Sequence, residues 1–232
     1  MTLPLVLLPG MMCDARLFAP QITALATDRE VLVPGLTGAD SIAALADTVL
    51  AAAPPRFALG GLSMGGIVAM EVIARAPERV AGLALMDTNP RAEMPEKQAT
   101  RAPQIAKVEA GGLATVMRDE MKPSYLADGP RKPEILDLCM GMALDLGPEV
   151  FTAQSIALRD RPDYRDALAR VTVPTLILCG RLDALCPVTR HEEIHRLVSG
   201  STLEIIENAG HLPTLEQPDT TNAALARWLE EI

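Results

Sequence analysis

Six short apolar runs most constrain the fold of this chain, because each is continuous and does not alternate with polar residues. They are rich in Leu, Val and Ile, and they cover residues 3–9, 30–34, 56–62, 80–87, 174–180 and 202–207. A strand that is apolar on both of its faces is normally covered on both, as in parallel sheets. The runs therefore predict a parallel β-sheet between two other layers.

Helical patterns separate most of these runs. They cover residues 41–53, 64–77, 187–200 and 220–232. Ser41 is a favourable N-cap, and Pro187 suits the first turn of the helix that it begins. Because strands and helices alternate along the chain, the predicted class is α/β with three layers.

Residues 88–170 break this alternation. The block is helical in composition, is interrupted by Gly and Pro, and contains no strand pattern. It is too long to be a loop. We interpret it as a helical cap inserted over one end of the sheet, so residues 1–87 and 171–232 are expected to form the core.

Charge and cysteine content limit the partners and the compartment. The net charge of -9 argues against a general nucleic-acid binder and against docking on anionic membranes. Four cysteines without a C-x-x-C pair suggest reduced thiols and a cytoplasmic protein. The first residues lack the basic start of a signal peptide, and they are interpreted as a strand.

A serine follows the third apolar run in the pattern G-x-S-x-G, at residues 61–65. This pattern is typical of a nucleophile elbow, a sharp turn from a strand into a helix. Gly61 and Gly65 leave room for the strained backbone of Ser63, and the start of the helix favours negative charge there. Ser63 is therefore the candidate nucleophile.

A nucleophilic serine needs a base, and the base needs an acid that orients it. His211 follows the last apolar run, and Asp183 follows the fifth. The carboxyl ends of parallel strands meet at one edge of a sheet, so these residues are expected to gather around Ser63. Asp87, at the end of the fourth run, is the rival acid, although a simple turn also explains it.

The loop after the first run is the expected source of an oxyanion donor. Gly10 lets the backbone turn close to the site, and the N–H of Met11 is the candidate beside that of Met64. An ordinary turn at Pro9-Gly10 is the alternative reading.

Three segments, GLSMGG, CGRLDALCP and NAGHLPTLEQP, carry a resemblance over nearly the whole chain. With them the chain resembles the α/β-hydrolase superfamily, and in particular its small, cofactor-free, capped esterases and lactonases. The resemblance implies Ser63, Asp183 and His211 as a catalytic triad. Many relatives carry His-Gly where this chain has Pro9-Gly10. The strands that usually lead the fold are missing, so a minimal six-stranded sheet in the order 2-1-3-4-5-6 is expected.

The resemblance implies a serine hydrolase of small carboxylic esters, thioesters or lactones, with no cofactor and no metal. Two alternatives on the same fold are a C–C bond hydrolase, lyase or synthase and a non-catalytic ligand receptor. The cap also carries basic residues that an acidic carrier protein would attract. They are interleaved with acidic residues, so a solvated face is the simpler interpretation: Lys97, Arg101, Lys107, Arg118, Lys122, Arg131 and Lys132.

Residues 191–195 read HEEIH, which matches the zinc-binding pattern H-E-x-x-H. A third ligand at the usual spacing is missing, because position 201 is Ser. We interpret the segment as a solvated, charged helix, with His191 and His195 at the margin of its buried face.

Overall fold

The computed structural model describes residues 2–232, and within them six strands form one parallel sheet. The strands are β1 (Leu5–Leu8), β2 (Val31–Leu32), β3 (Phe57–Leu62), β4 (Val80–Met86), β5 (Thr175–Gly180) and β6 (Thr202–Ile206). Their spatial order is β2-β1-β3-β4-β5-β6, and every neighbouring pair is parallel. The predicted class and strand order are confirmed.

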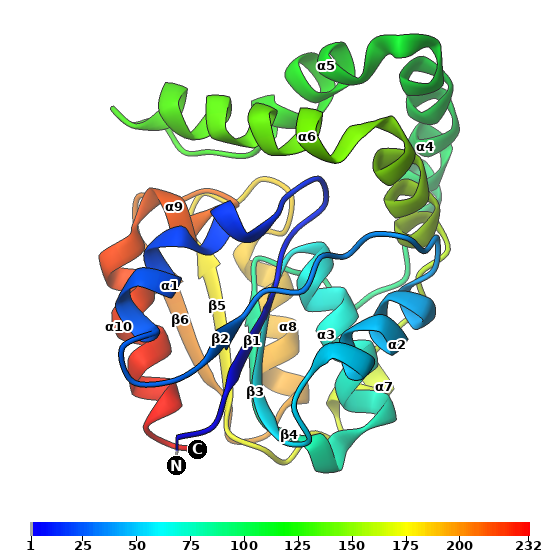
Figure 1. Ribbon diagram of the computed structural model, residues 1–232. Helices are drawn as coiled ribbons and strands as arrows, with labels where there is room; N and C mark the ends of the chain where they lie inside the picture. The colour runs from blue at the N-terminus through cyan, green and yellow to red at the C-terminus, as the bar shows by residue number, and fades with distance from the viewer. Residues whose placement is uncertain (1) are drawn as a thin grey trace.

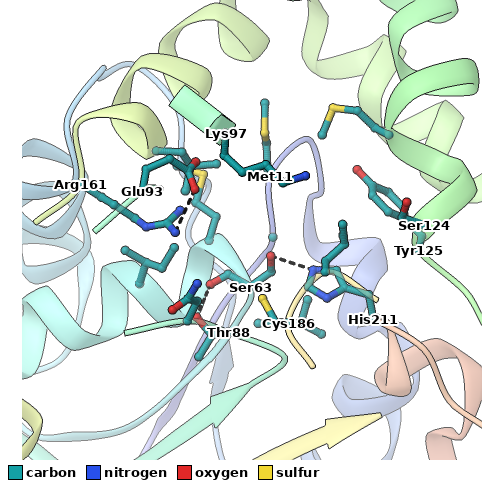
Figure 2. A pocket seen from close by; sticks show the side chains of 18 of the residues that line it. Met11, Ser63, Thr88, Glu93, Lys97, Ser124, Tyr125, Arg161, Cys186 and His211 are labelled. Carbon is teal, nitrogen blue, oxygen red and sulfur yellow. Dashed lines mark hydrogen bonds and ion pairs between the residues drawn. The ribbon is translucent and has the colours of Figure 1, made fainter. Parts of the chain in front are cut away.

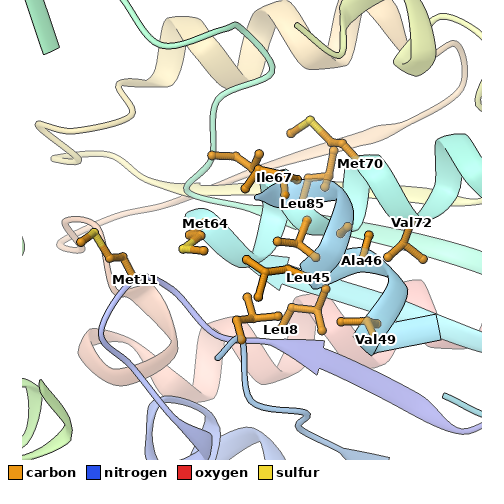
Figure 3. Close-up of a cluster of buried hydrophobic side chains, with 14 of the residues drawn as sticks. Leu8, Met11, Leu45, Ala46, Val49, Met64, Ile67, Met70, Val72 and Leu85 are labelled. Carbon is orange, nitrogen blue, oxygen red and sulfur yellow. The ribbon is translucent and has the colours of Figure 1, made fainter. Parts of the chain in front are cut away.

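Helices cover both faces of the sheet (Figure 1). One face packs against α2 (Ile42–Ala52), α3 (Met64–Arg75) and α8 (Val188–Leu197). The other packs against α1 (Ala19–Leu25) and α10 (Pro218–Leu229). Successive residues of a strand point to opposite faces, and both faces are apolar here. Figure 3 shows part of the first layer, whose buried side chains include Leu8, Leu45, Met70 and Leu85.

The chain's single tryptophan packs within the second layer, between α10 and the sheet. Trp228 of α10 is 3% exposed, and its indole N–H donates a hydrogen bond to the carbonyl of Pro174 at 3.1 Å. A Cβ atom on Gly82 of β4 would collide with the side chain of Ile232 and would come within 3.2 Å of the Trp228 ring. A glycine in the strand thus makes room for Ile232 and for the edge of the ring.

The connection from β4 to β5 carries helices that lie over one end of the sheet (Figure 1). They are α4 (Pro95–Lys107), α5 (Leu113–Val116) and α6 (Lys132–Arg159), with the short turns η3 (Val108–Gly112), η4 (Met117–Met121) and η5 (Lys122–Ser124). A further helix, α7 (Arg165–Leu168), packs beside α3 and α8. Residues 88–170, all of them described, contain no strand.

The remaining elements are η1 (Ala15–Phe18), η2 (Pro77–Arg79) and α9 (Pro213–Glu216). Among residues 2–232, none of the helices combines the length and the apolar character needed to span a bilayer.

Candidate active site

Ser63 lies on the sharp turn between β3 and α3. Its φ is 55°, a left-handed value that costs energy for a residue with a side chain. A Cβ atom on Gly61 would collide with the backbone of Gly65, and one on Gly65 would collide with the carbonyl of Leu8. The turn can therefore form only with glycine at both positions, as the G-x-S-x-G pattern predicts.

Ser63, His211 and Asp183 form one hydrogen-bonded chain. Nε2 of His211 lies 2.9 Å from Oγ of Ser63, and Nδ1 lies 2.8 Å from Oδ2 of Asp183 (Figure 2). His211 is 4% exposed and follows β6, while Asp183 is 4% exposed and follows β5. The carboxyl ends of three strands thus bring these side chains together at one edge of the sheet.

The surroundings of Asp183 favour its charged form. Burial opposes ionisation, but the neighbouring His211 and the N–H groups of Leu185 and Cys186 outweigh it and lower the pKa of the carboxyl. Both N–H groups donate to Oδ1, at 2.8 and 3.0 Å. Asp183 is therefore held as an anion against the imidazole.

Asp87, the rival acid, is fully buried beside these hydrogen-bonded side chains but is not hydrogen-bonded to His211. Its Oδ1 accepts the N–H of Gly180 at 2.9 Å, and Oδ2 has no partner among residues 2–232. Burial, and next the charge of Asp183, raise the pKa of Asp87 well above its ordinary value. Of the two aspartates, only Asp183 contacts the histidine.

The HEEIH segment lies on α8, but its first histidine is not solvated. His191 is fully buried, and its Nε2 accepts the backbone N–H of Thr88 at 2.9 Å. The hydroxyl of Thr88 donates to the carbonyl of Ser63 at 2.7 Å. The prediction that His191 lies at a solvated margin is wrong, because the turn after β4 needs an acceptor there.

His195 does lie on the exposed side, where its Nδ1 is 2.9 Å from Oγ of Ser201. Within the described chain, one group of His, Cys, Asp and Glu side chains brings its ligand atoms within 4.8 Å of one another, and it consists of Asp183, Cys186 and His211. His191 and His195 therefore do not converge on a common position.

Two side chains that the sequence did not single out for this role, the half-buried Glu216 and the buried Gln154, position the site. Glu216 accepts the N–H groups of Gly210 and Leu212 on either side of His211, at 2.9 and 3.0 Å, and also that of Ala127. Gln154 of α6 accepts the N–H of Met12 at 2.8 Å. The segment NAGHLPTLE contains both His211 and Glu216, and it could have indicated the role of Glu216. No motif in the sequence marks Gln154.

The backbone N–H groups of Met11 and Met64 have no acceptor among residues 2–232. Met64 is the first residue of α3, so no preceding turn of the helix accepts its N–H. No hydrogen bond from the N–H of Met11 occurs within residues 2–232. Met12, the next residue, has a φ of 55°, so the loop after β1 turns sharply at this point.

A cavity of about 350 Å³ opens over Ser63. Ser63, His211 and Met11 line it from the sheet side, and residues of α4 and η4 line it from the other side. Lys97 and Arg101 of α4 are among them. For Arg101 the interpretation as a solvated basic face is wrong, because its side chain is 14% exposed and is paired with Glu93 in the cavity wall. Lys97 lines the cavity but is exposed, as that interpretation expects.

Comparisons with known proteins identify the family of this chain. A family model described as "Alpha/beta hydrolase family" matches residues 5–224. The pimeloyl-[acyl-carrier protein] methyl ester esterase of Neisseria meningitidis serogroup A is 28% identical over 82% of this chain. The 3-oxoadipate enol-lactonase 2 of Acinetobacter baylyi is 29% identical over 74% of this chain. The matched segment spans 62% of the length of each of these two relatives.

Among solved structures, a thermophilic esterase from Thermogutta terrifontis, determined with malate bound, is similar over 99% of this chain and 90% of its own. Its sequence identity is 30% and the TM-score is 0.90.

Proposed function

The chain belongs to the alpha/beta hydrolase family, and we propose that it is a serine hydrolase of small carboxylic esters, thioesters or lactones. The observation that carries the proposal is the chain of hydrogen bonds from Asp183 through His211 to Ser63, which ends in the cavity. The esterase and lactonase names of the relatives support the same class of reaction.

The reaction follows from the roles of these three side chains. Oγ of Ser63 attacks the acyl carbon while Nε2 of His211 takes its proton, and Asp183 stabilises the resulting imidazolium. The bond to the leaving oxygen or sulfur then breaks, and His211 returns the proton to it. Water, deprotonated by His211, attacks the acyl-enzyme and releases the acid and the free serine.

The oxyanion of each tetrahedral intermediate needs donors that are already in position. The N–H groups of Met11 and Met64 are our candidates, because neither has an acceptor among residues 2–232 and both residues line the cavity together with Ser63. Donors of this kind typically contribute about a hundred- to a thousandfold in turnover.

We also propose that residues 88–170 act as a substrate-binding cap over a core of residues 1–87 and 171–232. The lining of the cavity supports this division, since the nucleophile lies on one side of it and α4 on the other. The cap would then determine which acyl groups reach Ser63.

Replacing Ser63 with Ala tests the proposal. The variant is expected to keep the fold and to lose turnover of p-nitrophenyl esters, because only the attacking oxygen is removed. A fluorophosphonate probe should label wild-type protein on Ser63 alone, as mass spectrometry would report. Turnover that survives in the variant, or that is lost on treatment with EDTA and restored by zinc, would contradict the serine mechanism.

A further inference from the structure

Three largely buried charged side chains form part of the cavity wall. Oε2 of Glu93 lies 2.9 Å from Nη2 of Arg101, and Oε1 lies 3.1 Å from Nη2 of Arg161. The side chains of Glu93, Arg101 and Arg161 are 6%, 14% and 7% exposed. Because two guanidinium groups share one carboxylate, this cluster leaves one positive charge without a counter-charge.

Arg101 also has donors that the protein does not use. Its Nε is buried and has no hydrogen-bond partner among residues 2–232, and its Nη1 meets only the sulfur of Met11, at 3.7 Å. A buried donor without a partner is unfavourable, and native structures seldom keep one without a role. Arg101 and Met11 both belong to the lining of the cavity.

Lys97, one turn earlier on α4, adds a second positive charge. Its ammonium group lies over the space above Ser63 in Figure 2, and within the described chain Lys97 takes part in no ion pair. The other carboxylate of the lining, Glu120, is bound to Lys107 at 2.6 Å. The cavity is thus cationic in a protein whose net charge is -9.

The position of the cations indicates which part of a substrate they would contact. His211 returns its proton to the leaving group, so the leaving group lies on the side of His211. Glu93 and Arg161 lie across Ser63 from His211 in Figure 2. Arg101 is paired with Glu93 and so lies on the same side, and a ligand group that reaches Arg101 therefore belongs to the acyl part.

We propose that Arg101 and Lys97 bind a carboxylate on the acyl part of the substrate. The preferred substrates are then monoesters of dicarboxylic acids, or lactones whose acyl chain carries a free carboxylate. Arginine suits this role because its planar group can give a carboxylate two parallel hydrogen bonds. A cavity of about 350 Å³ has room for a short chain of this kind. This inference rests on the proposed function of Ser63.

The experiment compares two esters that differ only at the end of the acyl chain. They are the mono-p-nitrophenyl ester of adipic acid and p-nitrophenyl hexanoate, in which a methyl group replaces the carboxylate. We expect the wild-type enzyme to prefer the adipate ester in kcat/KM. Arg101→Met should lower kcat/KM for that ester about ten- to a hundredfold, the loss typical for removing a charge-assisted hydrogen bond. In the same variant, kcat/KM for the hexanoate ester should change by about threefold or less.

Two further variants keep the test decisive. Lys97→Met removes an exposed side chain that packs little, so it is expected to fold even if Arg101→Met does not, and it should show the same selective loss. Arg118→Met removes an exposed arginine, paired with Asp119 outside the cavity lining, and it should change neither ester.

The outcomes separate this inference from the proposed function. Equal wild-type activity on both esters, or equal losses for both in Arg101→Met and Lys97→Met, would overturn the inference and leave the serine hydrolase standing. Equal losses would mean that these side chains only hold α4 in place. No turnover of either ester and no labelling of Ser63 would instead contradict the proposed function. A carboxylate on the alcohol part of the ester should raise kcat/KM, relative to an uncharged ester, by less than the carboxylate of the adipate ester does. The reverse result would mean that the cationic side chains contact the leaving group.

Discussion

At the scale of single residues, the two carboxyl groups near His211 differ in pKa because they differ in contacts. Asp183 is hydrogen-bonded to the imidazole and to two N–H groups, which lower its pKa. Asp87 has one N–H donor and a buried, unpaired oxygen, and its pKa is raised. We therefore expect Asp183 to ionise at a lower pH than Asp87.

Asparagine substitutions should separate the two aspartates. Asp183→Asn removes the charge and favours the wrong tautomer of His211, a change that costs about 10⁴-fold in turnover in serine proteases. Asp87→Asn keeps an acceptor for the N–H of Gly180 and leaves the contact between Asp183 and His211 in place, so a loss of about tenfold or less is expected. Steady-state kinetics on one activated ester would measure both, and a reversed order would make Asp87 the acid.

His191 gives a second prediction at this scale, in the dependence of stability on pH. Burial lowers its pKa from 6.5 to about 4. Between these values the unfolded chain binds a proton that the folded protein does not, so stability falls as pH falls through this window. The shift corresponds to a loss of about 3 kcal/mol in the free energy of unfolding. Urea denaturation at a series of pH values, followed by circular dichroism, would measure it.

His191→Gln tests the source of that loss. Glutamine keeps an acceptor for the N–H of Thr88 but does not titrate, so stability should depend less on pH in the variant than in the wild type. His195→Gln, on the exposed side of the same helix, is the matched control and should follow the wild type. If the free energy of unfolding depends on pH in the same way in all three proteins, His191 is not the titrating group.

At the scale of elements, the turn from β3 into α3 depends on close backbone approach. A side chain on Gly65 would meet the carbonyl of Leu8, so α3 could not start beside β1. Gly65→Ala should therefore cost about 3 kcal/mol or more in stability, or prevent folding. Gly141→Ala, within α6, meets nothing closer than 3.9 Å and should stabilise by about 0.5–1 kcal/mol. Thermal unfolding compares the two, and equal melting temperatures would contradict the close approach.

Some features of these elements could be predicted from the sequence and others could not, for physical reasons. The six strands could be predicted to within about two residues, because continuous apolar runs have few other uses in a chain of this length. The side that His191 presents could not, because the helical pattern of α8 does not reveal that an N–H of another turn needs an acceptor. Arg101 could not be assigned to the cavity for the same reason, since its orientation depends on how α4 lies over the sheet.

At the scale of the whole molecule, the sheet was easier to predict than the block of residues 88–170. Parallel strands of one sheet must bring their carboxyl ends to one edge, so the meeting of Ser63, Asp183 and His211 followed from their order along the chain. The helices over this edge obey no comparable rule. Their packing follows from side-chain contacts such as that of Gln154 with Met12, which no motif encodes.

The burial of Trp228 also determines what the intrinsic fluorescence of this protein can report. The only indole of the chain lies between α10 and the sheet, outside the residues that line the cavity. Its fluorescence will shift to the red when the core opens to water, and it will stay nearly constant when a small ligand fills the space above Ser63. Intrinsic emission is therefore a clean monitor of unfolding, while binding has to be followed with a chromophore on the ligand.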